Sequence, residues 1–172
     1  MSGMRTEKTP GVFTIEELEN TPGYKMKEIE KRNRPYVLIE CIEDIPCNPC
    51  ETSCPSGAII VGEPITSLPT VDLDKCIGCG ICVAVCPGLA VFVVNPDDGD
   101  GNATLMFPYE YLPAPKAGSS VPATNRLGEI VCTASVLKVL QPQKDNRTLV
   151  ITIQFPKQYV NDVRGIDFRK IV

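Results

Sequence analysis

The sequence predicts an α+β protein with a pseudo-symmetric, cysteine-rich core and a small β-domain towards its C-terminus. Three observations lead to this fold class. Two cysteine blocks match when the chain is shifted by 32 residues, and a short strand pattern precedes each block. Beyond residue 100, apolar and polar residues alternate with the period of two that is typical of strands.

Residues 1–35 form the first expected segment. Thr14 and Glu17 have the spacing of a capping box, which predicts a short helix that runs to about Glu19. The stretch "KMKEIEKR" predicts a second helix. Because this segment can bury few apolar residues, we expect an extended or helical N-terminal docking segment that packs against another surface.

Residues 36–99 form the second expected segment and hold eight of the nine cysteines. In "DKCIGCGICVAVCPG", residues 74–88, four cysteines are separated by two, two and three residues, and a proline follows the last. The earlier stretch "ECIEDIPCNPCETSCPSG" repeats the second half of this pattern but not the first. Each half reads as a strand, a cysteine loop, a short helix and a second strand, with "YVLIE" and "TVDLD" as the leading strands.

Residues 100–172 form the third expected segment, a small β-rich domain. Its predicted strands are "ATLMF", "GEIVCTASVLKVL" and "TLVITIQF", and "PQKDNR" is expected to join the last two as a hairpin-like connection. The turn-forming stretch 95–102 marks the expected boundary with the preceding segment. The ninth cysteine, Cys132, is expected to be a small buried hydrophobic side chain.

The composition excludes several classes of function. A net charge of −4 argues against a nucleic-acid partner, and no apolar run is long enough for membrane insertion. The absence of histidine excludes Ser-His and Cys-His catalytic pairs, and we expect no catalytic residues. Without an apolar export signal the chain is expected to be cytoplasmic, where its cysteines stay reduced and act as metal ligands.

Cysteines at every third position favour an iron–sulfur cluster. Three such thiolates can wrap three corners of a cubane, and a distant cysteine supplies the fourth, with a proline that turns the chain away. The alternative is an all-cysteine zinc-binding interaction module, because zinc sites also use C-x2-C pairs. Zinc pairs usually come as two ligands plus two, so three cysteines in close succession favour iron and sulfur.

The motif "CIGCGICVAVCP" resembles that of the bacterial two-[4Fe-4S] ferredoxin family, and the resemblance covers about residues 36–94. It implies a dicluster ferredoxin core with two [4Fe-4S] clusters, in which the fourth cysteine of each block serves the other cluster. Applied to this chain, the ligands of cluster two are Cys54, Cys76, Cys79 and Cys82. The ligands of cluster one are Cys47, Cys50, Cys86 and one further residue.

Two residues compete for the remaining position in cluster one. Asp44 lies where the repeat would place a cysteine, three residues before Cys47, and Cys41 lies three residues further back. A thiolate is the better ligand for iron, and a five-residue loop can still close, so Cys41 is favoured over Asp44 or an open three-iron corner. The first block then differs from the second by a loop insertion and still supplies a complete set of ligands.

The wider arrangement consists of "IECIEDIPCNPCETSCP", the second cysteine block, "PYEYLPAP" and the β-rich tail. It resembles the small ferredoxin-like subunits of flavin-dependent dehydrogenases of amino acids and amines, such as the multi-subunit proline dehydrogenases. The resemblance implies an electron-transfer subunit that carries single electrons between a flavoprotein partner, which holds FAD, and an acceptor in an oxidoreductase hetero-oligomer. A freely diffusing ferredoxin that serves several redox enzymes is the alternative.

The surroundings of the two clusters predict different reduction potentials. Gly78 and Gly80 free the backbone near cluster two to point amides at sulfur, which raises its potential. Pro46 and Pro49 remove amide donors near cluster one. Four carboxylates add negative charge there, so cluster one is expected to have the lower potential. They belong to Glu40, Glu43, Asp44 and Glu51.

Overall fold

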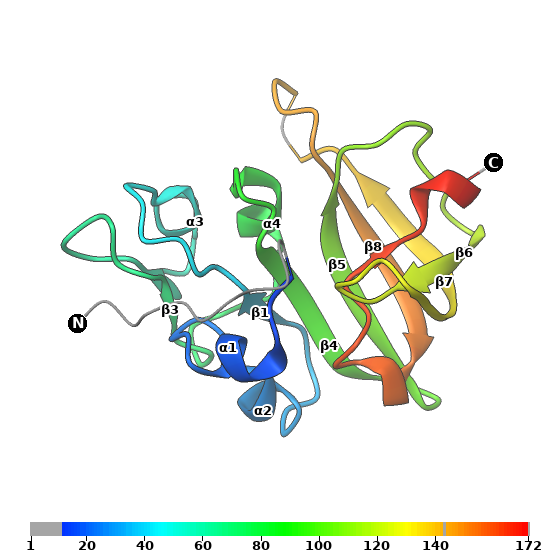
Figure 1. Ribbon diagram of the computed structural model, residues 1–172, viewed down its shortest axis with the longest axis horizontal. Helices are drawn as coiled ribbons and strands as arrows, with labels where there is room; N and C mark the ends of the chain where they lie inside the picture. Colours follow the sequence, from blue (N-terminus) through cyan, green and yellow to red (C-terminus); the bar gives the residue numbers. More distant parts are fainter. Residues whose placement is uncertain (1–11, 143, 172) are drawn as a thin grey trace.

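The computed structural model describes residues 12–142 and 144–171. Its largest element is an antiparallel sheet of seven strands in the order β1-β4-β5-β8-β7-β6-β9 (Figure 1). These strands are β1 (Tyr36–Ile39), β4 (Val91–Gly99), β5 (Asn102–Tyr109), β6 (Ser120–Thr124), β7 (Ile130–Leu140), β8 (Leu149–Pro156) and β9 (Gly165–Ile166). A second sheet pairs β2 (Ile59–Ile60) with β3 (Thr70–Val71).

Short helices complete the described part of the chain. They are α1 (Ile15–Glu19), α2 (Met26–Ile29), α3 (Pro49–Thr52), α4 (Ile81–Val85) and the 3₁₀-helices η1 (Lys157–Tyr159) and η2 (Phe168–Lys170). In Figure 1, α1, α2 and α3 lie on one side of β4, and β5, β7 and β8 lie on the other. No helix within the described residues has both the length and the apolar character needed to span a bilayer.

The N-terminal segment packs against the rest of the chain. Thr14 Oγ1 accepts a hydrogen bond from the Glu17 amide at 3.2 Å, and the Glu17 carboxylate accepts one from the Thr14 amide at 2.9 Å. This geometry confirms the predicted capping box at the start of α1. Leu18, Met26 and Ile29 are buried in the same hydrophobic core as β1 and β4. The described part of the expected docking segment therefore contributes to the core of this chain.

Replacing Thr14 with alanine is expected to loosen α1. Alanine cannot accept the hydrogen bond from the Glu17 amide, and loss of such a cap costs about 1 kcal/mol. The amide of Leu18, which donates to the Thr14 carbonyl at 3.1 Å, is then expected to exchange with deuterium about fivefold faster. Thr14→Ser keeps the hydroxyl and is the matched control. Equal exchange rates in the two variants would contradict a capping role.

One sheet runs through the second and third expected segments. β4 pairs with β5 across a hairpin whose turn is at residues 100–101, inside the stretch expected to form the boundary. Val93 and Val94 of β4 and Leu105 of β5 are at most 2% exposed. The residues on both sides of the hairpin therefore share one buried interface.

The strands predicted beyond residue 100 are present as β5, β7 and β8, and β7 and β8 form the predicted hairpin. Two further strands were not predicted. β6 contains Pro122, which weakens a strand pattern, and β9 is only two residues long. Cys132 lies on β7 and is half-buried, so it is more exposed than the prediction of a buried side chain allows.

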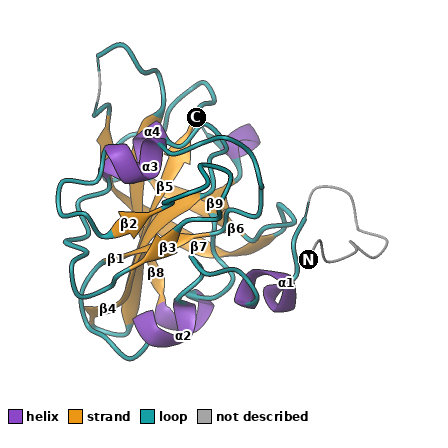
Figure 2. Cartoon of the chain, turned by 90° about the vertical axis from the view of Figure 1, so that its left-hand side faces the viewer, coloured by secondary structure: helices purple, strands orange, loops and turns teal. Residues whose placement is uncertain are grey.

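In the cysteine region, the strands of each half pair with strands of the other half. The first half consists of β1, a cysteine loop, α3 and β2, and the second consists of β3, a cysteine loop, α4 and β4. This is the predicted order of elements in both halves. β1 pairs with β4 and β2 pairs with β3, so the first strand of each half lies beside the second strand of the other. The helices α3 and α4 also contact each other, as Figure 2 shows.

Candidate metal centre

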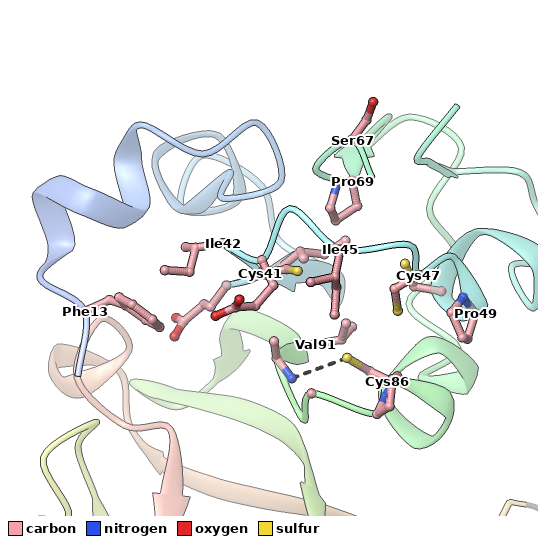
Figure 3. Close-up of a pocket in the computed structure, with 17 residues that line it drawn as sticks. Phe13, Cys41, Ile42, Ile45, Cys47, Pro49, Ser67, Pro69, Cys86 and Val91 are labelled. Atoms are coloured by element: carbon pink, nitrogen blue, oxygen red, sulfur yellow. Dashed lines mark hydrogen bonds between the residues drawn. The ribbon is translucent and has the colours of Figure 1, made fainter. Parts of the chain in front are cut away.

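Four of the predicted ligand cysteines line one cavity. The cavity has a volume of about 170 Å³ and lies between the loop after β1, α3 and the segment before β4 (Figure 3). Its cysteines are Cys41, Cys47, Cys50 and Cys86. Burial, followed by the nearby thiols of Cys86, Cys47 and Cys41, raises the pKa of Cys50 to about 11. We call Cys41, Cys47, Cys50 and Cys86 group one.

The other four cysteines gather around Cys82, and we call them group two. Burial raises the pKa of Cys82 to about 12, and the neighbouring thiols of Cys79, Cys76 and Cys54 add to this effect. The two groups are adjacent, because α3, which carries Cys50 of group one, contacts α4, which carries Cys82. Cys76 and Cys82 are buried, whereas Cys79 is exposed, which leaves one edge of group two open to solvent.

The pairing of strands between the two halves explains why each group includes one cysteine from the other half. Cys54 precedes β2, and β2 pairs with β3, which leads into Cys76. Cys86 precedes β4, and β4 pairs with β1, which leads into Cys41. Strand pairing therefore brings Cys54 and Cys86 across to the opposite group.

In the described part of the chain, backbone amides donate hydrogen bonds to the sulfurs of Cys54, Cys76 and Cys86. The pairs are Ala58 to Cys54 Sγ at 3.3 Å, Ala90 to Cys86 Sγ at 3.5 Å and Val37 to Cys76 Sγ at 3.4 Å. The contact of Ala90 with Cys86 is the dashed line in Figure 3. Ala58 and Ala90 each lie four residues after their cysteine, so the repeat extends to these contacts. Amides directed at sulfur stabilise thiolates and raise cluster potentials, so this donor set fits an iron–sulfur cluster.

Cys41 lines the cavity of group one and Asp44 does not. Cys41 is half-buried, and its sulfur faces the same space as the sulfurs of Cys47 and Cys86 in Figure 3. Asp44 is exposed on the loop inserted between Cys41 and Cys47. This placement supports a thiolate rather than a carboxylate as the fourth donor of group one.

Two glycines in the second cysteine loop have left-handed backbone conformations. Gly78 has a φ of +65°, and Gly80 has a φ of +78°. A Cβ atom on Gly78 would lie 2.7 Å from the carbonyl oxygen of Pro35, and one on Gly80 would lie 3.1 Å from Met106 Sδ. The loop therefore packs tightly against the residues before β1, and this close approach requires glycine at position 78.

Within residues 12–142 and 144–171, no group of three histidine, cysteine, aspartate or glutamate side chains converges to hold one metal ion. Each cysteine group brings four thiols together, and backbone amides donate to sulfurs in both groups. Four separated thiolates are what a cubane needs at its corners.

Glu40 is not an unpaired negative charge beside group one. Its side chain is 10% exposed and forms ion pairs with Arg126 and Arg164. Burial would raise the pKa of Glu40, but the two guanidinium groups outweigh it and hold the pKa below its ordinary value. The expectation that Glu40 adds an unbalanced negative charge beside cluster one is therefore wrong, because two arginines pair with it. The arginines lie 86 and 124 residues further along the chain, so no local spacing pattern indicated them.

The second cysteine block matches a known protein family. Residues 69–92 match the family described as 4Fe-4S binding domain, and this stretch includes the following cysteines: Cys76, Cys79, Cys82 and Cys86. The chain therefore contains a 4Fe-4S binding domain. The match covers one of the two cysteine blocks.

Curated relatives match stretches of the chain. It is 49% identical over 47 residues to a subunit of the ion-translocating oxidoreductase complex of Methanosarcina acetivorans, which covers 27% of this chain and 17% of the relative. It is 41% identical over 56 residues to the polyferredoxin-like subunit of aliphatic sulfonate oxidoreductase of Pyrococcus furiosus, with coverages of 33% and 30%. It is 30% identical over 97 residues to a subunit of the F(420)H(2) dehydrogenase of Methanosarcina mazei, with coverages of 55% and 52%.

This chain spans about half or less of the length of these relatives. No solved structure matches it significantly. The family match and the relatives together define an iron–sulfur chain of the 4Fe-4S type, similar to subunits of oxidoreductase complexes.

Proposed function

We propose that this chain is an electron-transfer subunit of an oxidoreductase complex, built on a pseudo-symmetric dicluster ferredoxin core. Group one holds one [4Fe-4S] cluster and group two holds the other. When bound, each cluster accepts and releases one electron at a time. The chain itself supplies the thiolates, directs amides at sulfur and excludes water from the buried cysteines.

One observation carries this proposal: the cysteines form two adjacent groups of four, each with three members from one block and one from the other. Adjacent groups suit the passage of single electrons between two centres, and that task requires no substrate pocket. The amide contacts at Cys54, Cys76 and Cys86 support the same interpretation, because such contacts set cluster potentials.

The partner in this proposal is a flavoprotein that holds FAD and oxidises an amino acid or an amine. The resemblance of the whole arrangement to the small subunits of such dehydrogenases supports this choice of partner. Electrons have an exposed route at Cys79, which lies beside Ile77 and Ile81, 61% and 37% exposed. Apolar side chains at this edge suit contact with another protein surface.

A mild purification of the native protein tests the proposal. We expect about eight iron atoms and eight acid-labile sulfides per chain, and a brown colour that dithionite bleaches. Flavin-bearing chains are expected to co-purify and to be identified by mass spectrometry. A chain with both clusters that elutes alone would instead support a freely diffusing ferredoxin. Zinc without sulfide would overturn the proposal in favour of an all-cysteine zinc module.

A further inference from the structure

A buried ionic cluster joins three parts of the chain beside group one. Glu40 follows β1, Arg126 lies between β6 and β7, and Arg164 precedes β9. Arg126 Nε lies 2.9 Å from Glu40 Oε2, and Arg164 Nε lies 2.7 Å from Glu40 Oε1. The side chains of Arg126 and Arg164 are 15% and 4% exposed. We call these three residues the Glu40 cluster.

The Glu40 cluster carries more positive than negative charge. One carboxylate faces two guanidinium groups, and both arginines stay protonated in proteins. Further hydrogen bonds from these guanidinium groups go to uncharged carbonyl oxygens of Val160, Val163 and Asn161. Arg164 Nη2 is buried and has no hydrogen-bond partner within the described residues. Burying a surplus charge is costly, so a nearby anion would stabilise this arrangement.

The Glu40 cluster reaches group one through Glu40. Glu40 lines the same cavity as Cys41 and Cys86, and it immediately precedes Cys41 in the chain. The Glu40 amide donates to the Ala90 carbonyl at 2.8 Å, and the Ala90 amide donates to Cys86 Sγ at 3.5 Å. The backbone of Glu40 therefore connects to two of the four cysteines. Thiolates around a cubane give the centre the negative charge that the Glu40 cluster lacks.

We propose that Arg126 and Arg164 raise the reduction potential of the centre held by group one, and that they do so through their surplus charge next to Glu40. They are tuning residues, because the structure pairs them with Glu40 and their charge acts on the centre through space. This inference rests on the proposed function. It gives the C-terminal part of the chain a role in electron transfer, since both arginines lie beyond residue 100.

Two substitutions at Arg126 test the inference without leaving a buried charge unpaired. Arg126→Gln removes one positive charge and leaves Glu40 paired with Arg164. We expect it to lower the potential of the group-one centre by about 59 mV, which is about a tenfold change in the one-electron reduction equilibrium. Arg126→Lys keeps the charge but loses the two-pronged geometry of the guanidinium. In Arg126→Lys, the potential of the group-one centre is expected to differ from that of the unaltered protein by less than about a third of that shift.

The readout is a dithionite titration of the whole protein, followed by electron paramagnetic resonance at fixed pH and ionic strength. Cys41→Ser, which alters one centre, identifies the signal of group one. Glu40→Gln is expected to shift that potential upward, opposite to Arg126→Gln, whereas a purely structural disturbance would not reverse sign. Arg169→Gln removes the same charge from a guanidinium that is 69% exposed and pairs with the buried Asp167, and it is the control, with no expected shift.

The outcomes separate this inference from the proposed function. If the unaltered protein lacks iron and sulfide, the proposed function fails and takes the inference with it. If both centres are present but Arg126→Gln leaves the potential unchanged, the tuning role is overturned and the proposed function stands. Loss of the group-one centre from Arg126→Gln, or an equal shift in Arg126→Lys, also overturns tuning, because geometry rather than charge would then dominate.

Discussion

Replacing Cys86 with alanine is expected to remove the cluster held by the first cysteine block, although Cys86 belongs to the second. Cys86 lines the same cavity as Cys41, Cys47 and Cys50, because the pairing of β4 with β1 carries it there. Iron and sulfide content are expected to fall to about half, since one of two clusters is lost. The paramagnetic signal of the remaining reduced cluster should persist.

Matched variants decide whether ligation crosses between the blocks. With crossing, Cys86→Ala should give the same spectrum as Cys47→Ala, and Cys54→Ala the same spectrum as Cys82→Ala. If Cys86→Ala instead matches Cys82→Ala, each block holds its own cluster and the crossed arrangement is wrong. Cys132→Ala is the control, because Cys132 lies on β7 and belongs to neither group, so both signals should remain.

Gly78→Ala is expected to disrupt the second cysteine loop severely. A left-handed conformation costs alanine about 1–2 kcal/mol, and Gly78 has a φ of +65°. The added Cβ would also lie 2.7 Å from the Pro35 carbonyl oxygen, which is a backbone atom and cannot rotate away. With about 1–3 kcal/mol more for the overpacking, the total is about 2–5 kcal/mol. We expect group two to lose most of its cluster on purification.

The measurement is the paramagnetic signal of each reduced cluster, together with the rate at which the visible absorbance bleaches on warming. Gly88→Ala is the control, since Gly88 lies outside the left-handed region and nothing lies within 4 Å of an added Cβ. The control should keep both clusters and bleach at the unaltered rate. If Gly78→Ala behaved like Gly88→Ala, the close packing of the loop would not matter for cluster binding.

Features that depend on neighbouring residues were predictable. The capping box of Thr14 and Glu17 is present because its two hydrogen bonds join residues three apart. β5, β7 and β8 follow from alternating side chains, and the helices α3 and α4 follow from the repeat of the cysteine loops. The resemblance to two-[4Fe-4S] ferredoxins implied which thiols lie near each other, and the placement of Cys41 in the cavity supports the preferred fourth donor.

Features that depend on distant residues were not predictable in the same way. β6 and β9 are short, and they become strands only because β6 pairs with β7 and with β9. The hairpin between β4 and β5 could equally have been a linker, because its glycines and aspartates form turns in either setting. Sequence reasoning also treated Glu40 as a free negative charge.

The sequence by itself determined the chemistry of this protein: eight cysteines in two related blocks, with a spacing that suits cubane clusters and a composition without histidine. Tertiary structure alone decided the electrostatic surroundings of group one, where Arg126 and Arg164 meet Glu40. The physical reason is that ligand spacing is set by the local chain, whereas a buried charge finds its partners only when distant strands pack into one sheet.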